Sequence, residues 1–367
     1  MEFKALKFTN GQNKEFVAVL RERVNQYFKD HDISTYGNAS MFVKMVFMLL
    51  LYFIPYGISV SGLVSNFWIL LSLWVVMGFG MAGIGFSVMH DANHGAFSKN
   101  EKVNRFIGLV INLIGGFALT WQIQHNTLHH SYTNIDSYDE DINPGKFLRF
   151  SPHKPRYWAH RFQHIYGWFL YGLMTISWST DKDFVQLIRY KREGHKLSAS
   201  RSFRRLMVEL IGLKAGYFAY MLLIPMLFMP VPWWQILILF VAMHYVSGFL
   251  LAIVFQSAHV IETSAFPLPN EAGNVENNWA VHQLATTSDF APKSKLLSWF
   301  IGGLNYQVEH HLFPNICHIH YQKIAPIIRQ TAHEFSLPYH VQSTFVRAIW
   351  MHGRMLRMLG QNDSIPV

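Results

Sequence analysis

The chain has 367 residues, of which 51% are hydrophobic and only 14% are charged. Soluble domains usually carry about 25% charged residues, so this composition is typical of a membrane protein. The net charge of +9 fits cytoplasmic loops beside anionic lipid. No nucleic-acid-reading motif accompanies it, so we expect no nucleic-acid partner. Cys317 is the only cysteine, which excludes an internal disulfide and a thiolate metal cage.

Residues 1–40 are polar and are expected to form a cytoplasmic N-terminal arm. Apolar residues recur within them at helical spacing, which predicts one amphipathic helix. This helix is expected to lie on the membrane or on the protein's own cytoplasmic face. The apolar residues are Phe16, Val17, Val19, Leu20, Val24, Tyr27 and Phe28.

Four stretches are long and apolar enough to cross a bilayer, which takes about 20 residues. They cover roughly residues 41–61, 66–88, 206–229 and 234–257. The joins within the first pair and within the second pair are short and uncharged, so each pair forms a helical hairpin. The sequence therefore predicts an all-α membrane protein with four transmembrane helices, and we treat residues 41–367 as one domain.

Two shorter apolar stretches, Phe106–Trp121 and Ile165–Ser179, are expected to lie in the membrane interface or in the protein core. The basic residues support this prediction. Of the 31 Lys and Arg residues, 16 lie between Lys99 and Arg205, and the hairpin joins contain none. With four spans, every basic loop lies on one side, as the positive-inside pattern requires. Both termini are then cytoplasmic, and in a bacterium the membrane is the inner one.

The region after the fourth span, residues 258–367, begins with a polar stretch rich in Pro and Asn and then becomes apolar again. We expect it to form a cytoplasmic helical cap over the spans. Internal repeats and low-complexity tracts are absent from the sequence.

Histidines cluster next to these predicted spans. His125 and His129 are four residues apart, so on a helix both rings project from one face, with His130 about 100° further round. His90 and His94 repeat this spacing directly after the second span. Further histidines follow the fourth span and lie in the cap, namely His259, His310 and His311.

These eight histidines are all predicted on the same side of the membrane. A solvated histidine-rich turn is the simple explanation for one cluster, but three clusters at helix ends favour a metal site. Imidazole suits zinc, copper, iron and nickel. One metal rarely takes more than six ligands, so eight nitrogens suggest two metals, each with room for water or dioxygen.

Carboxylates lie close to the histidines in the sequence. A metal-bound histidine usually donates its other N–H to a carboxylate or carbonyl. We therefore expect Asp91, Asp136 and Glu309 to support the metal ligands, with Asp139 and Asp141 as further members of this class.

Four glycines of the second span and one histidine of the fourth span are expected to have structural roles. Gly78, Gly80, Gly83 and Gly85 occur at small-x-x-small spacing, which predicts close helix packing. His244, inside the fourth span, is expected to be neutral and hydrogen-bonded.

The histidine motifs resemble those of the membrane fatty-acid desaturases. The matching segments are HDANHGAF (90–97), WQIQHNTLHHSYTN (121–134), FQSAH (255–259) and NYQVEHHLFP (305–314). The likeness is closest to bacterial acyl-lipid or linoleoyl-CoA-like desaturases related to front-end desaturases. It extends over nearly the whole chain and includes the hairpin spacing.

This resemblance implies a di-iron site whose ligands and catalytic residues are the eight histidines: His90, His94, His125, His129, His130, His259, His310 and His311. Many members of the family have a histidine where this chain has Gln307, and front-end enzymes have glutamine. Gln307 would ligate iron weakly, act through a water, or only orient its neighbours.

The resemblance also implies the chemistry. Two iron ions would use dioxygen and two electrons to remove two hydrogens from neighbouring carbons of an acyl chain and form a double bond. The substrate would be a fatty acyl lipid, an acyl-CoA or an acyl-carrier conjugate. A His-Pro-Gly-Gly haem motif is missing, so a separate ferredoxin or cytochrome b type protein is expected to supply electrons at the basic cytoplasmic surface.

Two alternatives remain open at this stage. A hydroxylase or ketolase would use the same metal centre and differ in the fate of the second hydrogen. A membrane metal transporter or sensor would instead need polar residues along its spans, which are almost free of them apart from Glu209, Lys214 and His244.

Overall fold

The computed structural model describes residues 3–9 and 13–361. Four of its helices are long and apolar enough to cross a membrane: Ala39–Val60, Phe67–Asn93, Phe203–Phe228 and Trp233–His259. Each predicted span overlaps one of these helices almost completely. The prediction of a helical membrane protein is therefore confirmed, and each of the four predicted spans corresponds to one candidate span.

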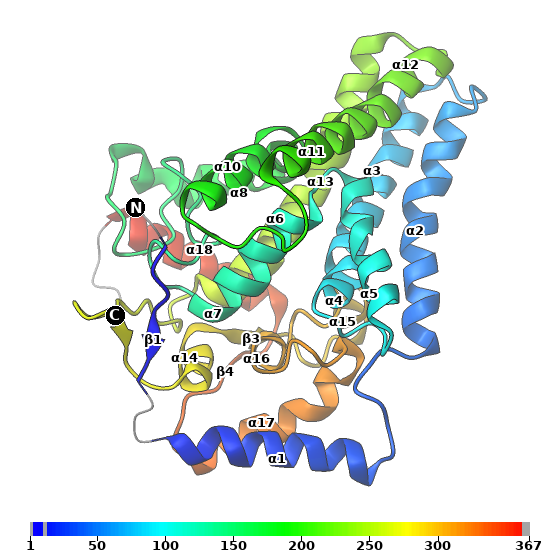
Figure 1. Cartoon of the computed structure of the whole chain (residues 1–367). Helices are drawn as coiled ribbons and strands as arrows, with labels where there is room; N and C mark the ends of the chain where they lie inside the picture. Colours follow the sequence, from blue (N-terminus) through cyan, green and yellow to red (C-terminus); the bar gives the residue numbers. More distant parts are fainter. Residues whose placement is uncertain (1–2, 10–12, 362–367) are drawn as a thin grey trace.

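The spans form two hairpins, and the inner helix of each hairpin carries the core. In Figure 1, α2 (Ala39–Val60) runs beside α3 (Phe67–Gly83). The second hairpin consists of α11 (Phe203–Phe218), α12 (Ile224–Phe228) and α13 (Trp233–His259). In an 18-residue apolar stretch of each span, 61% and 56% of the second and fourth are buried, against 28% for the other two. The helices α3 and α13 are thus the inner pair.

Glycines allow these helices to approach closely. A Cβ atom at Gly78 would lie 2.7 Å from the carbonyl oxygen of Met243 on α13. A Cβ atom at Gly80 would lie 2.8 Å from the backbone nitrogen of Tyr52 on α2. Such distances are too short for any side chain, so the predicted packing role of these glycines is confirmed.

Two spans continue through a π-helical turn. The second span passes through the π turn Ile84–Met89 into α4 (His90–Asn93). The third passes from α11 to α12 through the π turn Ala219–Leu223. Single π turns inside α-helices occur frequently at functional sites.

The stretch that includes Phe106–Trp121 is bent. Its first half contains α5 (Glu101–Gly108) and the 3-10 turn Leu109–Ile114. Its second half contains α6 (Ala118–Gln122), the π turn Ile123–His129 and α7 (His130–Tyr132). The two halves meet at 112°, and a left-handed residue, Gly115 with φ of +88°, begins the turn. By length and composition the bent pair could count as a fifth span, so its place outside the bilayer stays a prediction.

The second short stretch packs against the inner helix α13. It contains the 3-10 turn Trp158–Phe162, α8 (Gln163–Gly172), α9 (Met174–Ser177), the π turn Trp178–Lys182 and α10 (Asp183–Arg192). The Thr175 hydroxyl donates a hydrogen bond to the carbonyl oxygen of His244 on α13 (2.8 Å). His244 itself is buried and hydrogen-bonded to the Tyr217 hydroxyl, as predicted.

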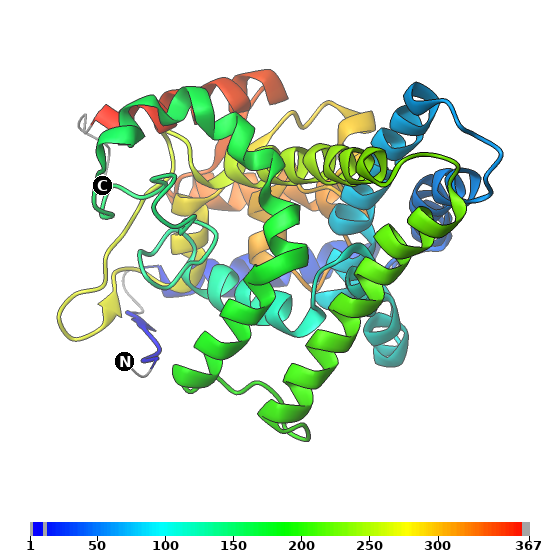
Figure 2. The ribbon, with the colours of Figure 1, turned by 90° about the horizontal axis from the view of Figure 1, so that it is seen from above.

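The remaining elements form a cap at one end of the spans (Figure 1). Its helices are α14 (Trp279–Thr286), α15 (Lys295–Phe300), α16 (Gln307–Leu312), α17 (Tyr321–Glu334) and α18 (Phe345–Gln361), with a 3-10 turn at His318–His320. Two short parallel pairs join distant segments: β1 (Lys7–Phe8) with β2 (Asn274–Val275), and β3 (Ser288–Phe290) with β4 (His340–Gln342). Figure 2 shows α18 beside α8.

The predicted N-terminal helix is present as α1 (Lys14–Asp30). Its apolar face is buried through Phe16, Leu20, Val24 and Phe28, and it lies along α17 at the bottom of Figure 1. Arg23 forms an ion pair with Glu334 (2.7 Å) at the end of α17. This helix therefore packs on the protein's own cap.

Candidate metal centre

The fold brings all eight predicted histidines together at the junction of spans and cap. They come from four places in the chain: the end of the second span, the π turn and start of α7 in the bent pair, the last residue of α13, and α16. Seven of them are buried and His94 is half-buried. The helix ends that supply them are far apart in sequence and meet only in the folded protein.

The histidines form two groups in which the nitrogens lie within 4.8 Å of one another. The first group consists of His90, His94, His125 and His310. The second group consists of His129, His259 and His311. His130 lies between them, because it shares a cluster with His310 of the first group and His311 of the second.

The π turn Ile123–His129 brings together histidines that are five residues apart in the chain. In a π-helix the repeating hydrogen bond joins residues five apart, so residues at i and i+5 lie above one another. The Nε2 atoms of His125 and His130 are accordingly only 3.3 Å apart. A regular α-helix was expected over this motif, and the structure has a π turn over Ile123–His129 instead.

The nitrogen spacings in the first group, and between His310 of that group and His130, fit a shared metal ion. The Nε2 atoms of His90 and His125 are 3.0 Å apart, and those of His130 and His310 are 2.9 Å apart. Two imidazole nitrogens at about 2.1 Å from one ion lie roughly 3 Å from each other. These side chains can therefore hold a metal without a large movement.

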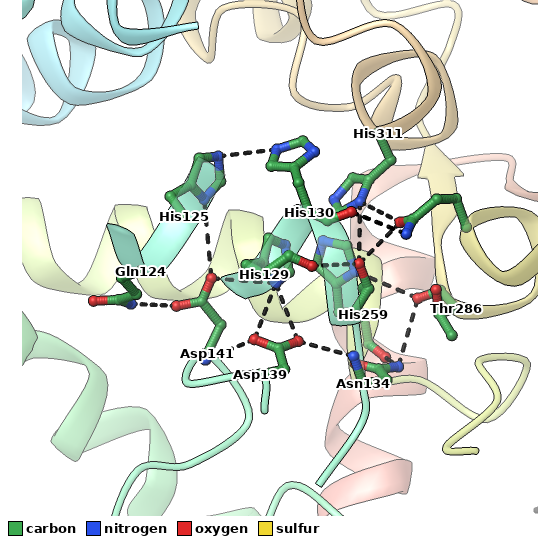
Figure 3. Close-up of polar contacts among 12 residues, drawn as sticks. Gln124, His125, His129, His130, Asn134, Asp139, Asp141, His259, Thr286 and His311 are labelled. Carbon is green, nitrogen blue, oxygen red and sulfur yellow. Dashed lines mark hydrogen bonds and ion pairs between the residues drawn. The ribbon is translucent and has the colours of Figure 1, made fainter. Parts of the chain in front are cut away.

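In the second group each ring is held by its Nδ1 atom (Figure 3). His129 donates to the carboxylate of Asp139 (3.1 Å), and His311 donates to the amide oxygen of Gln283 (2.8 Å). The third ring, His259, lies 3.3 Å from the carbonyl oxygen of Thr286. Such partners fix the tautomer that carries its lone pair on Nε2.

The Nε2 atoms of these three histidines are buried and have no hydrogen-bond partner among the described residues. The Nε2 of His94 in the first group is in the same situation. A buried polar atom without a partner is costly, so several in one place need an explanation. A bound metal supplies one, because it would occupy these lone pairs.

Burial keeps most of the rings neutral, as metal binding requires. Burial, reinforced by neighbouring imidazoles, lowers the pKa of His125, His130, His310 and His311 well below the ordinary value. For His129 burial also lowers the pKa, but the carboxylates of Asp139 and Asp141 outweigh it and raise the pKa to about 9. A metal ion at His129 would thus displace a proton at neutral pH.

The three acids expected beside the ligands have different surroundings. Asp91 Oδ1 lies 3.8 Å from His90 Nδ1, but its Oδ2 accepts a hydrogen bond from His318 Nδ1 (2.8 Å). Glu309 accepts a hydrogen bond from the Tyr339 hydroxyl (2.7 Å). Asp136 pairs with Lys154 (3.3 Å), and the support of His129 comes from Asp139 instead.

Several partners of the histidines could not be found in the sequence. Gln283 and Thr286 lie on α14 in the cap, within a stretch that carries no metal-binding motif. His318 contacts Asp91 and also lies 2.7 Å from the Lys44 ammonium. Both nitrogens of His318 are thus in use, which argues against a metal ion in the cluster of Asp91, Cys317 and His318.

Gln307 begins α16, three residues before His310. Its side chain is buried, and its amide nitrogen has no partner among the described residues. A 180° rotation exchanges the amide oxygen and nitrogen, so an oxygen can equally occupy this position. A role beside the metal centre stays a prediction for this residue.

A cavity of about 830 Å³ leads to the first group. Its lining is mostly apolar and includes His90 and His125. Apolar side chains lie along it, among them Met81, Met89, Ile111, Ile114, Phe150 and Leu251. Charged residues also line it, among them Glu140, Asp181, Lys182 and Arg189. This arrangement can hold an apolar chain beside the histidines while a polar group remains among the charged residues.

These features define a class: a helical membrane protein with a buried polyhistidine centre at the end of an apolar cavity. The family model for fatty acid desaturases matches residues 65–343. The chain therefore belongs to the fatty acid desaturase family, and it is an oxidoreductase that acts on fatty acyl chains.

Individual relatives are similar over nearly the whole chain. An sn-1 linoleoyl-lipid 6-desaturase of Arthrospira platensis is 36% identical over 98% of this chain and 96% of its own length. A protein of the same name from Synechocystis sp. is 34% identical over 97% of this chain and 98% of its own length. An acyl-lipid (8-3)-desaturase of Physcomitrium patens is 37% identical over 98% of this chain and 74% of its own length.

Proposed function

We propose that this protein introduces a double bond into an acyl chain of a membrane glycerolipid, with two histidine-bound iron ions, dioxygen and externally supplied electrons. The observation that carries the proposal is the cluster of eight histidines beside an apolar cavity, four of them with a buried Nε2 atom that has no partner among the described residues. An unactivated methylene offers no acid, base or electrophilic centre to protein side chains. A metal must therefore supply the hydrogen-abstracting chemistry.

The eight histidines would hold two irons, one in each group. The rings of the second group are held by Asp139, Gln283 and the backbone of Thr286. Their Nε2 atoms are therefore already oriented toward a common point before a metal binds. Gln307, Asp91 and Glu309 are proposed as neighbours that orient the ligands.

A glycerolipid fits the cavity better than a highly charged carrier. The charged residues along its lining include both signs, Lys182 and Arg189 beside Asp181 and Glu140. Arg189 and Glu140 also form an ion pair with each other. A strongly anionic head such as coenzyme A would find little net positive charge there. The names of the relatives, which act on acyl-lipids, agree with this choice.

The side chains that line the cavity would position the acyl chain and exclude water. Trp121 lines the cavity beside the first group, with its ring centroid 4.6 Å from that of His125. Rings packed in this way hold one pair of methylenes close to the histidines. This fixed geometry is the main contribution that a protein makes to such a reaction.

The electrons would come from a separate ferredoxin or cytochrome b type protein. Formation of one double bond with reduction of dioxygen to two waters consumes two electrons and two protons in addition to the two substrate hydrogens. The concentration of basic residues in the loops between Lys99 and Arg205 supports docking on the cytoplasmic side, with both termini on that side.

The proposal is tested by expression of the chain in a bacterial host, followed by mass spectrometry of the fatty acids released from each lipid class. A new double bond in glycerolipid acyl chains is the expected product, with about two irons per purified chain. An acyl chain with one added oxygen would instead identify a hydroxylase. A purified protein that carries another metal, or no metal, would contradict the di-iron assignment.

A further inference from the structure

Lys214 is a buried cation in the third span that the proposed chemistry does not use. It lies on α11, and only 5% of its surface is exposed. A buried ionisable residue in a membrane span is costly, so its partners deserve to be identified. Its ammonium group donates three hydrogen bonds, the maximum for lysine. The acceptors are the carbonyl oxygens of Gly115 (2.6 Å) and Trp178 (2.7 Å) and the carboxylate of Asp183 (2.5 Å).

One of the three acceptors, Trp178, lines the acyl cavity, and the other two lie directly beside residues that line it. Gly115 begins the sharp turn of the bent pair, and its neighbours Ile114 and Gly116 line the cavity. Trp178 lines the cavity directly. Asp183 begins α10, and the cavity is lined by residues on both sides of it, Lys182 and Val185. One ammonium group thus joins two segments beside the cavity to a membrane span: the bend at Gly115, and the continuous stretch from Trp178 to Asp183.

The same network reaches the metal centre. The second oxygen of Asp183 accepts a hydrogen bond from the Thr120 hydroxyl (2.5 Å). Thr120 directly precedes Trp121 on α6, and the Trp121 ring centroid lies 4.6 Å from that of His125 and 5.7 Å from that of His90. A shift of Lys214 or Asp183 would therefore be transmitted to a ring that lines the cavity and packs against two of the histidines.

We propose that Lys214, acting through Asp183 and Thr120, is a positioning residue that determines which pair of acyl carbons lies beside the histidines. This inference rests on the proposed function. Neighbouring carbons of an acyl chain are only about 1.5 Å apart. A wall displaced by that distance presents the next carbon, so the position of the new double bond depends on how firmly the wall is held.

The test compares double-bond positions in the products of variant proteins. The double variant Lys214→Met with Asp183→Asn removes both charges, so that neither remains buried without a partner. Thr120→Val is milder, because it keeps the Lys214–Asp183 pair and breaks only the link to α6. The control is Arg201→Met with Glu209→Gln, which removes a partly exposed ion pair at the same helix, away from the cavity lining.

We expect the wild type and the control to form one positional isomer. The double variant should form a second isomer, with the double bond one carbon away, in a proportion at least about tenfold above wild type, and Thr120→Val should shift the same ratio less. Iron content per chain should be unchanged. A single, unaltered isomer in the variants would overturn the inference, whatever the total yield. If the double variant does not accumulate in the host, the isomer ratio of Thr120→Val alone tests the inference.

A second readout requires no turnover. Thermal unfolding of the purified proteins is measured with dipalmitoyl or distearoyl phosphatidylglycerol in detergent. The wild type and the control should be stabilised to different degrees by the two lipids, whereas the double variant should lose this discrimination. Equal discrimination in all proteins would overturn the inference. If the wild type forms no double bond, the proposed function is wrong. The effect of the double variant on lipid discrimination then still tests whether Lys214 positions the acyl chain.

Discussion

The two histidine groups differ in what holds their rings. In the second group, His129, His259 and His311 each direct Nδ1 to an acceptor outside the centre. In the first group, two of the four histidines, His90 and His125, line the cavity, and the rings pack against one another and against Trp121. The comparison leads to a hypothesis: hydrogen bonds would hold the metal ligands in the second group, and packing would align the substrate at the first group.

The largest effect is expected from loss of a ligand in the second group. His259→Ala removes a buried nitrogen that points into this group. We expect product formation to fall by more than about 100-fold and the metal content to fall with it. Fatty-acid analysis and metal analysis of the purified protein provide the measurement. His164→Ala, at a half-buried histidine on α8 outside both groups, should retain activity and metal.

Asp139→Asn should have the next largest effect. The carboxylate accepts hydrogen bonds from His129 and from the backbone of Asn134 and Asp141. Loss of its charge should weaken metal binding by about 10- to 100-fold. Titration of the metal-free protein with Fe²⁺ measures this change. Asp136→Asn is a matched control from the same loop and should change the affinity by less than about twofold. Equal effects of both variants would contradict the assignment of Asp139 to His129.

A smaller and different effect is expected at the first group. Trp121→Leu should lower product formation by about tenfold while the metal content remains that of the wild type. The reason is that the ring borders the cavity and packs against His125 without offering a ligand atom. Loss of metal in this variant would show that packing and metal retention are not separate, and the hypothesis of different roles for the two groups would then be wrong.

The smallest effect concerns acid stability outside both groups. Burial lowers the pKa of His282 and of His352 to about 4. Between pH 6.5 and 4 the unfolded chain binds protons at these rings and the native protein does not, so stability is lost as the pH falls through this range. Each ring contributes up to about 3 kcal/mol to this loss.

His352→Gln should therefore flatten the decline of the unfolding midpoint between pH 6.5 and 4. The midpoint is measured by thermal unfolding of the metal-free protein in detergent. His333→Gln, at an exposed position on α17, should leave the slope unchanged. A slope in His352→Gln that matches the wild type would contradict the assignment of acid sensitivity to this ring.

The sequence by itself predicted the four spans, their pairing into hairpins, the N-terminal helix and the cap. These features follow from local hydropathy, charge and periodicity, which do not depend on distant residues. The histidine motifs were equally visible, because each lies within a few residues of chain. The sequence also predicted that His90, His259 and His311 share one side of the membrane, although it could not show which of them share a group.

Only the tertiary structure decided the finer arrangement. The π turn at Ile123–His129 divides one motif between two groups, and periodicity alone does not distinguish such a turn from an α-helix. The contact of His311 with Gln283 and the burial of Lys214 against Asp183 join residues 28 and 31 positions apart. Such contacts depend on how whole helices pack, and no local pattern in the chain encodes them.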